Sequence, residues 1–319
     1  MVSAVGGAPR PVHWATLGEA GLSAGLWLLW FVHRLFGRWA FRALMAPATL
    51  WFVAARPVAR RASIDYLRRV GVLPAGAGRL RAWMGAVRHF SSFAETVLDK
   101  ALVWGGGLDV SRAPVEVDPR FDAAVRAGRG GVLLVAHVGN LEALRAFGRR
   151  LPGLRLNVLV HSANAVRFAR ALERLDARST AGLLQVTEMD AAMAASLAER
   201  VARGEWVVIA ADRVPISERA RTLSVDFLGA PAPLPVGPWV LARALGGPVY
   251  QLSCLKHGRT YRLRCEHFAE RIDWSRAGRD QALHALASRY ARGLEAQCRE
   301  APLQWFNFYP FWESDRDGH

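Results

Sequence analysis

The stretch GGVLLVAHVGNLE, residues 130–142, decides the fold of this chain of 319 residues. Its apolar residues 132–136 follow two glycines without a polar interruption. A short apolar run that begins after turn residues predicts a strand buried on both faces, as in the parallel sheets of α/β proteins. His137 follows this strand directly, at the carboxyl end where α/β proteins bind their ligands. The stretch therefore predicts both a central strand and the edge of the sheet at which a site lies.

Glu142 lies five residues after His137. In one continuous helix, a step of five residues corresponds to a rotation of about 140°, so the two side chains can meet only if the chain bends between them. Gly139 and Asn140 allow such a bend, with Asn140 as a helix N-cap and Glu142 in the first helical turn. A carboxylate placed there can bind one imidazole nitrogen and leave the other nitrogen basic toward a substrate hydroxyl.

Two simpler explanations of this pair stay open. The helix dipole favours a glutamate in the first turn of any helix, and a histidine at the end of a strand is often only a surface residue. The spacing therefore gives His137 and Glu142 as candidates for a general base and its carboxylate partner. Asn140, between them, is a candidate substrate-binding residue.

Outward from this stretch, short apolar runs alternate with helical patterns. Strands are expected at residues 132–136, 156–160, 183–186, 206–211 and 223–228, and as a hairpin of 249–255 with 261–268. Helices are expected at residues 60–70, 80–98, 140–149, 165–175, 191–203, 235–245 and 282–299. This alternation predicts an α/β fold with a mainly parallel central sheet flanked by helices.

A second candidate site follows another apolar run. Residues 206–211 are followed by Asp212 and Arg213, again at the carboxyl end of an expected strand. The two charges are as readily explained by a structural ion pair. As a substrate-binding pair they would act through Arg213, because a guanidinium suits a phosphate or a carboxylate. The Pro/Gly-rich residues 227–238 are expected to form a loop that runs into a helix, either beside a site or as a stiff connector.

The first 60 residues differ from the rest of the chain. Two apolar stretches, 21–36 and 39–55, are interrupted by charged residues and by Pro47. Neither reaches the roughly 20 mostly apolar residues of a bilayer span, and their tryptophans with nearby arginines are typical of a membrane–water interface. We expect a membrane-associating helical segment at residues 1–60, as a hairpin in the membrane surface rather than one span or buried core helices. A single globular domain is expected at residues 61–319.

The positive charge is concentrated in the same part of the chain. The whole chain has a formal net charge of +15, and residues 1–90 contain 12 Arg and no Lys against Glu19 and Asp65, which leaves +10 there. A basic block beside apolar segments indicates an anionic membrane surface, and its field would also attract an acidic protein. Nucleic acid is not expected, because no known recognition module is present. A codon bias toward Arg would explain part of the excess without any function.

Several other kinds of chemistry have no support in the sequence. The odd number of cysteines, three, without a CxxC pair predicts neither a disulfide framework nor a zinc site, and it fits a reducing cytosol. Dinucleotide, P-loop and GxSxG motifs are missing, and the N-terminus does not resemble a signal peptide. No metal or bound cofactor is expected. Five further histidines form no HExxH or other metal pattern and are interpreted as ordinary: His89, His161, His257, His267 and His284.

Taken in order, these segments resemble the lipid A late acyltransferase family (lauroyl and myristoyl transferases) of the lysophospholipid acyltransferase superfamily. The shared features are Trp14 and Gly18-Glu19 before an apolar segment, RASIDYL at 61–67, His137-x4-Glu142, Asp212-Arg213, FLGxP at 227–231 and Pro302-x-Gln304-Trp305. Leu141 stands where an aromatic residue commonly precedes the acid. The DRVP and WFNFYPFW segments, 212–215 and 305–312, are closer to a branch found beside aryl polyene pigment genes.

The resemblance implies transfer of a fatty acyl chain from a thioester of acyl carrier protein or CoA to a hydroxyl of a lipid or glycolipid. His137 would be the general base, oriented by Glu142, and residues 61–319 the acyltransferase domain. It also implies a location on the cytoplasmic face of the inner membrane, with an anionic membrane surface as partner and the thioester as donor substrate rather than cofactor. The departures from the common pattern leave the acceptor open. The competing hypothesis is a non-catalytic, membrane-bound lipid-binding or scaffold protein of the same fold.

Overall fold

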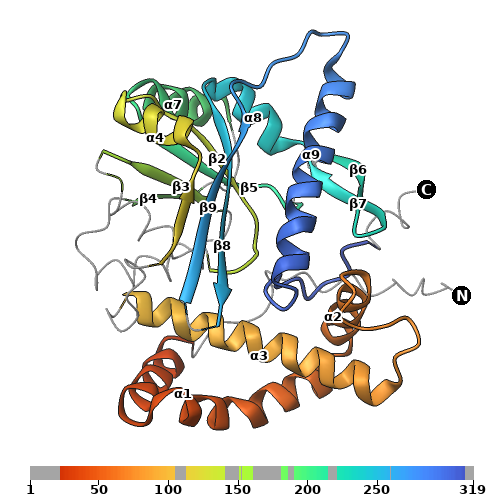
Figure 1. Ribbon diagram of the computed structural model, residues 1–319. Helices are drawn as coiled ribbons and strands as arrows, with labels where there is room; N and C mark the ends of the chain where they lie inside the picture. The colour runs from red at the N-terminus through yellow and green to blue at the C-terminus, as the bar shows by residue number, and fades with distance from the viewer. Residues whose placement is uncertain are drawn as a thin grey trace, which may run out of the picture.

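A seven-stranded sheet forms the centre of the protein (Figure 1). The computed structural model describes residues 22–104, 113–140, 151, 153–160, 181–185, 190–214, 221–258 and 260–312. The strands, in the spatial order β1-β9-β8-β2-β5-β3-β4, are β1 (Val115–Val117), β9 (Thr260–Ala269), β8 (Val249–His257), β2 (Gly131–Val135), β5 (Trp206–Ala210), β3 (Leu156–Val160) and β4 (Ala181–Gln185). Every neighbouring pair is parallel except β8 with β9. The predicted α/β fold with a mainly parallel sheet is confirmed.

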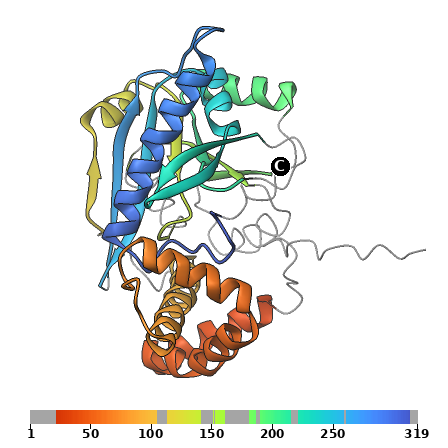
Figure 2. The same cartoon turned by 90° about the vertical axis from the view of Figure 1, so that its right-hand side faces the viewer.

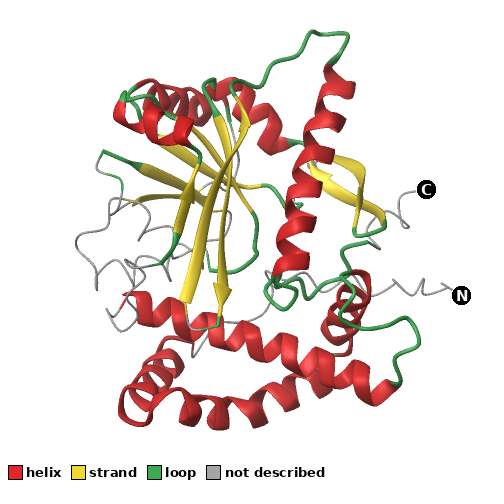
Figure 3. Ribbon diagram, in the orientation of Figure 1, coloured by secondary structure: helices red, strands yellow, loops and turns green. Residues whose placement is uncertain are grey.

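Helices surround the strands (Figure 3). They are α1 (Leu22–Ala55), α2 (Pro57–Arg69), α3 (Arg79–Trp104), α4 (Pro119–Arg126), α7 (Ala191–Ala202), α8 (Gly237–Leu245) and α9 (Arg279–Glu300). The first three gather at one end of the molecule (Figure 2). In Figure 1, α3 passes below the ends of the sheet strands, where β8 ends and β9 begins. Because β2 is parallel to β8, the carboxyl end of β2 points toward these N-terminal helices as well.

The central strand β2 is buried on both faces, as its uninterrupted apolar run predicts. Val132 and Leu134 belong to a core cluster that includes residues of α8 and α9, whereas Leu133 and Val135 pack with Phe121 of α4 on the other face. Alternate residues of a strand point to opposite faces, so both faces need an apolar cover. Each fully buried large apolar side chain contributes about 1.5–3 kcal/mol. The position of β2, and of His137 at its end, is therefore strongly determined by packing.

Three elements differ from the sequence-based expectation. The strand β1 and the helix α4 were not expected, and the expected loop at residues 227–238 contains a strand, β7 (Ala230–Pro235), paired antiparallel with β6 (Thr222–Phe227). The loop prediction was wrong at this point because its prolines stand at every second position of β7. In an antiparallel pair alternate N–H groups point away from the partner, so prolines with this spacing remove no hydrogen bond between the strands. The helix expected at 140–149, apart from its first residue, and the helix expected at 165–175 lie outside the described residues.

The helix α1 consists of two helical parts that meet at Gly37, whose φ of 77° and ψ of −172° are not helical. The break falls between the two apolar stretches that the sequence analysis separates. Figure 1 shows the two parts running in different directions. None of the helices in the described part of the chain combines the length and hydropathy that a bilayer span needs.

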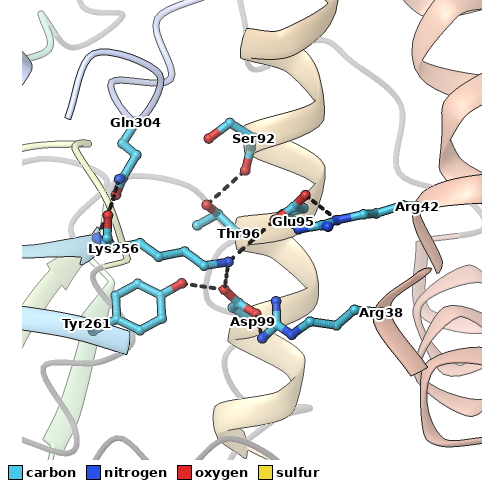
Figure 4. Close-up of polar contacts among 9 residues, drawn as sticks. All are labelled: Arg38, Arg42, Ser92, Glu95, Thr96, Asp99, Lys256, Tyr261 and Gln304. Carbon is cyan, nitrogen blue, oxygen red and sulfur yellow. Dashed lines mark hydrogen bonds and ion pairs between the residues drawn. The ribbon is translucent and has the colours of Figure 1, made fainter. Parts of the chain in front are cut away.

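A group of charged side chains connects α1 and α3 to the sheet (Figure 4). Asp99 of α3 is fully buried and accepts hydrogen bonds from Arg38 of α1 at 2.5 Å, Lys256 of β8 at 2.6 Å and Tyr261 of β9 at 2.6 Å. A buried carboxylate needs such partners, because an ionised group removed from water without them is very costly. These contacts fix α1 and α3 against the edge of the sheet at which β8 ends.

Candidate active site

The pairing of β2 with β5 brings His137 and Asp212 together. The two strands are parallel and in register, from Gly131 opposite Trp206 to Val135 opposite Ala210. The backbone pairing continues past the strand ends, where the Ala211 N–H donates to the Val135 carbonyl at 3.1 Å. His137 follows Val135 by two residues, and Asp212 follows Ala210 by two residues. The register of the sheet therefore places the two side chains next to one another.

Asp212 binds both the side chain and the backbone of His137. Its Oδ1 lies 2.8 Å from the imidazole Nδ1, and its Oδ2 accepts the His137 backbone N–H at 2.9 Å. The same Oδ2 accepts the indole N–H of Trp305 at 3.2 Å. The carboxylate is fully buried, whereas the His137 side chain is 37% exposed. An imidazole that is held from inside and open on its outer side is suited to exchange a proton with a bound molecule.

The electrostatic surroundings favour an ionised Asp212 beside a neutral imidazole. Burial raises the pKa of Asp212, but the attraction of His137, the hydrogen bonds from it and the charge of Arg213 outweigh burial and bring the pKa to about 2. Burial and the positive charge of Arg213 lower the pKa of His137 below its ordinary value, against the opposite effect of Asp212. An ionised carboxylate only accepts hydrogen bonds, so Nδ1 carries the proton and Nε2 is the basic nitrogen.

The chain turns sharply after His137. Gly139 has a φ of 70°, and a Cβ at this position would lie 2.0 Å from the Cys254 carbonyl oxygen, so only glycine fits. The Gly139 N–H donates to the Gln304 carbonyl at 2.9 Å, and the Asn140 N–H donates to the Cys254 carbonyl at 3.0 Å. The bend predicted between His137 and the following segment is confirmed at Gly139.

The other predicted site residues are distributed around this pair. Arg213 donates to the Phe306 carbonyl at 2.9 Å, and its charge acts on both His137 and Asp212. Asn140 is fully buried, and its side chain lies beside Tyr261. Burial raises the pKa of Tyr261, and the hydrogen bond with Asn140 lowers it by a smaller amount. Glu142 lies outside the described residues, so its pairing with His137 stays a prediction.

A family model for bacterial lipid A biosynthesis acyltransferases matches residues 111–314, which include the whole His137–Asp212 site. The chain belongs to this family. The chain is also similar to two curated relatives. It is 27% identical over 213 residues to proteins from two strains of Mycobacterium tuberculosis, each named phosphatidylinositol mannoside acyltransferase. The matched part covers 66% of this chain and 60% of each relative, so the chain spans about 60% of the length of these relatives.

Two residues of the site in this family member were not singled out as functional from the sequence. In the sequence analysis, Trp305 has no role beyond the C-terminal motif that supports the family resemblance. His89 was interpreted as an ordinary histidine. In the structure, His89 accepts from Ser63 at 2.9 Å and donates to the Trp305 carbonyl at 3.0 Å. No local pattern links residues so far apart, and only their shared burial beside the sheet edge identifies them.

Proposed function

We propose that this family member transfers a fatty acyl chain from a thioester donor to a hydroxyl of a membrane lipid or glycolipid, with His137 as the general base. The observation that carries the proposal is the 2.8 Å contact between the partly exposed imidazole and the buried carboxylate of Asp212. A hydroxyl is a poor nucleophile until its proton is removed, and a positioned base typically accelerates such a step by about 10²–10⁴-fold. The mycobacterial relatives, named for acylation of a phosphatidylinositol mannoside, support a glycolipid as the acceptor class.

The proposed reaction follows from the protonation states of the pair. The His137 Nε2 accepts the proton of the acceptor hydroxyl while the oxygen attacks the thioester carbonyl carbon. The tetrahedral intermediate then collapses, the carbon–sulfur bond breaks, and the imidazolium returns the proton to the leaving thiolate. Asp212 stays ionised throughout, keeps the proton on Nδ1 and stabilises the imidazolium. This reaction requires no resident cofactor.

We assign the orientation of the imidazole to Asp212 on the contact that the structure shows. The sequence-based hypothesis gives this role to Glu142, which lies outside the described residues. A neutral imidazole has one N–H, and Asp212 accepts it. If Nε2 is used for the substrate, Glu142 can contribute only through the substrate, the chain turn or another residue. The comparison of variants at the two acids, given below, distinguishes the two assignments.

Positive charge beside His137 supports an anionic group on one of the substrates. Arg213 and Lys100 both lower the pKa of His137, after the larger effect of burial, so both cations act at the site. A phosphopantetheine arm carries a phosphate, and acyl carrier proteins are acidic, so a positive field suits either donor. We propose that Arg213 binds this anionic group, with Asp212 and Asn140 as further substrate-binding residues. The assay described below determines whether the donor is a thioester of acyl carrier protein or of CoA.

The exposed apolar residues support attachment to a membrane surface. Within the described residues, all large apolar side chains that are exposed lie between Leu35 and Phe93, with the exception of Val240. The most exposed on α1 are Trp39 at 72% and Trp51 at 66%, and arginines are interspersed with them in the sequence. We propose that α1 lies in the cytoplasmic surface of the inner membrane, and that residues 1–60 form the membrane-associating segment of an acyltransferase domain at 61–319. Apolar insertion together with basic residues is the combination that anionic lipid surfaces bind.

The test is an acyl-transfer assay with purified full-length protein. Acyl carrier protein and CoA thioesters of the same fatty acid are supplied in parallel with total membrane lipids, and the acylated product is identified by mass spectrometry. We expect an acylated lipid with the wild type and none above background with His137→Ala. Lipid analysis of a deletion strain and its complemented form identifies the natural acceptor. A membrane-bound protein without transfer activity in either donor series would favour the scaffold hypothesis instead.

A further inference from the structure

Residues 304–306 contact almost every described part of the site. The Gln304 side chain accepts from the Lys256 backbone N–H at 2.8 Å and donates to the Lys256 carbonyl at 2.7 Å, as Figure 4 shows. The backbone of the same segment makes three further hydrogen bonds. The Gln304 carbonyl accepts the Gly139 N–H, and the Phe306 N–H donates to the His137 carbonyl at 3.3 Å. The Phe306 carbonyl accepts a hydrogen bond from the Arg213 side chain. This segment is therefore connected to the turn after β2 and to the end of β8.

Trp305, at the centre of the segment, is held from several sides. Its ring makes edge-to-face contacts with Tyr66 at 5.0 Å and Phe227 at 5.2 Å, and its side chain is 1% exposed. Its carbonyl accepts the N–H of His89, whose pKa burial lowers to about 4, so this histidine is a neutral donor at physiological pH. A rigid indole in this position can direct its one N–H with little freedom. That N–H donates to Asp212 Oδ2.

We propose that Trp305 is a positioning residue of the reaction, whose indole N–H keeps Asp212 in the orientation that binds the imidazole of His137. The inference rests on the proposed function, because it assumes that His137 is the base. Trp305 becomes a third member of the His137–Asp212 site. It acts only through Asp212 and touches neither the substrate nor the reacting atoms. Supporting residues of this kind hold a catalytic pair in its productive geometry, where small displacements reduce the rate strongly.

The indole N–H has two effects on the pair. It opposes rotation of the carboxylate, whose other donor on Oδ2 is the His137 backbone N–H. It also withdraws negative charge from Asp212, so its loss makes the carboxylate a stronger partner for the imidazolium. Among the described residues, the charged groups that act on His137 are Asp212, Arg213 and Lys100. With all three unchanged, loss of the indole N–H raises the pKa of His137.

The experiment compares Trp305→Phe with Trp312→Phe in the full-length protein. Trp312 is a matched control, since it is also buried, contacts the same Phe227 ring and donates its indole N–H to a backbone carbonyl at the same distance of 3.2 Å. We expect kcat of Trp305→Phe to fall about 10- to 100-fold with little change in KM. The acidic limb of its pH–rate profile should move to higher pH. Trp312→Phe should stay within about threefold of wild-type kcat with an unmoved limb.

A double variant separates a positioning role from a structural one. If Trp305 acts through Asp212, Asp212→Asn with Trp305→Phe should be no more than about twofold worse than Asp212→Asn alone. Losses that multiply would overturn the proposal. If Trp305→Phe does not fold by circular dichroism, β-(3-benzothienyl)alanine is introduced at position 305. It keeps the bicyclic shape and replaces only the N–H with sulfur, and the same kcat and pH readouts apply.

The two possible failures are distinguishable. If Trp305→Phe behaves like Trp312→Phe in both kcat and pH profile while His137→Ala and Asp212→Asn each lose most of their kcat, the positioning role is wrong and the proposed function stands. If His137→Ala keeps near-wild-type turnover, the proposed function is wrong, whatever the result at position 305.

Discussion

His137 Nδ1 and Asp212 Oδ1 lie 2.8 Å apart, although 75 positions separate the two residues in the sequence. Both residues stand two positions beyond the last paired residues of β2 and β5, so the contact follows from the register of two adjacent parallel strands. A backbone hydrogen bond from His137 to the other carboxylate oxygen fixes the same pair a second time. The imidazole is thereby held in one tautomer, with Nε2 as its basic nitrogen. The predictions on the reaction start from this relationship.

Replacement of His137 by alanine removes the proposed base. We expect acyl transfer by His137→Ala to fall by at least about 10²–10⁴-fold, because this is what a positioned base typically contributes. Initial rates with purified protein, together with circular dichroism, check the result. His284→Ala is the control, since His284 is an exposed histidine on α9, and its activity should be unchanged. Turnover near the wild-type level in His137→Ala would exclude the proposed mechanism.

The two candidate acids are compared by Asp212→Asn and Glu142→Gln. Asn at 212 cannot hold the imidazolium by charge and can favour the wrong tautomer, so we expect a loss of kcat close to that of His137→Ala. In the double variant His137→Ala with Asp212→Asn, the losses should not multiply, because the two groups act as one unit. We expect Glu142→Gln to lose less than Asp212→Asn. The reverse order would assign the orientation of His137 to Glu142, as the sequence spacing suggests.

The pH dependence of the reaction reports the charge of Arg213. The pKa of His137 is lowered by burial and then by Arg213, so the base stays neutral and active somewhat below its ordinary titration range. Arg213→Ala removes a positive charge, raises the pKa of His137 and should move the acidic limb of kcat/KM to higher pH. Arg213→Lys keeps the charge but loses the planar fork, so its limb should stay near that of the wild type while its KM increases. A limb that does not move in Arg213→Ala would place this charge outside the reach of His137.

Membrane attachment is tested on the surface of α1. The combined substitutions Phe36→Ser, Trp39→Ser and Trp51→Ser remove three exposed apolar side chains without a deletion. We expect loss of binding to vesicles of phosphatidylethanolamine and phosphatidylglycerol in a sedimentation assay. The wild type should stay bound in about 1 M salt, where the Debye length is about 3 Å and surface charge is screened. Val240→Ser on α8, at the opposite end of the molecule in Figure 1, serves as control and should bind normally. Unchanged binding of the triple variant would exclude α1 as the attachment site.

The buried charges around Asp99 predict a large effect on stability. Asp99→Ala leaves Arg38 and Lys256 without their buried carboxylate, and loss of one partner of a buried ion pair typically costs about 3–5 kcal/mol. Chemical denaturation should show this loss in the free energy of unfolding. Asp65→Ala is the matched control, because Asp65 is 48% exposed and pairs with Arg69 one turn away, an arrangement worth about 0–1 kcal/mol. Equal effects of the two variants would show that Asp99 adds no more than a surface ion pair.

Much of the sheet was predictable because buried parallel strands have a local signature. The expected strands at 132–136, 156–160 and 206–211 agree with β2, β3 and β5 within one residue at each end, and the expected hairpin agrees with β8 and β9. The strand β7 was missed because its prolines suggest a loop. Their compatibility with a strand depends on which N–H groups face β6, and that is a property of the pair rather than of either segment.

The sequence by itself determined that His137 and Asp212 each follow the carboxyl end of a buried strand, because hydrophobic runs and turn residues act locally along the chain. It did not determine that these two strands are neighbours in register. That depends on strand order, which results from the packing of both sheet faces against helices distant in sequence. The tertiary structure alone therefore decided that Asp212 is the carboxylate bound to His137, and that Trp305 and His89 support it from the C-terminal segment and α3. Such contacts join residues whose separation leaves no periodic pattern to detect.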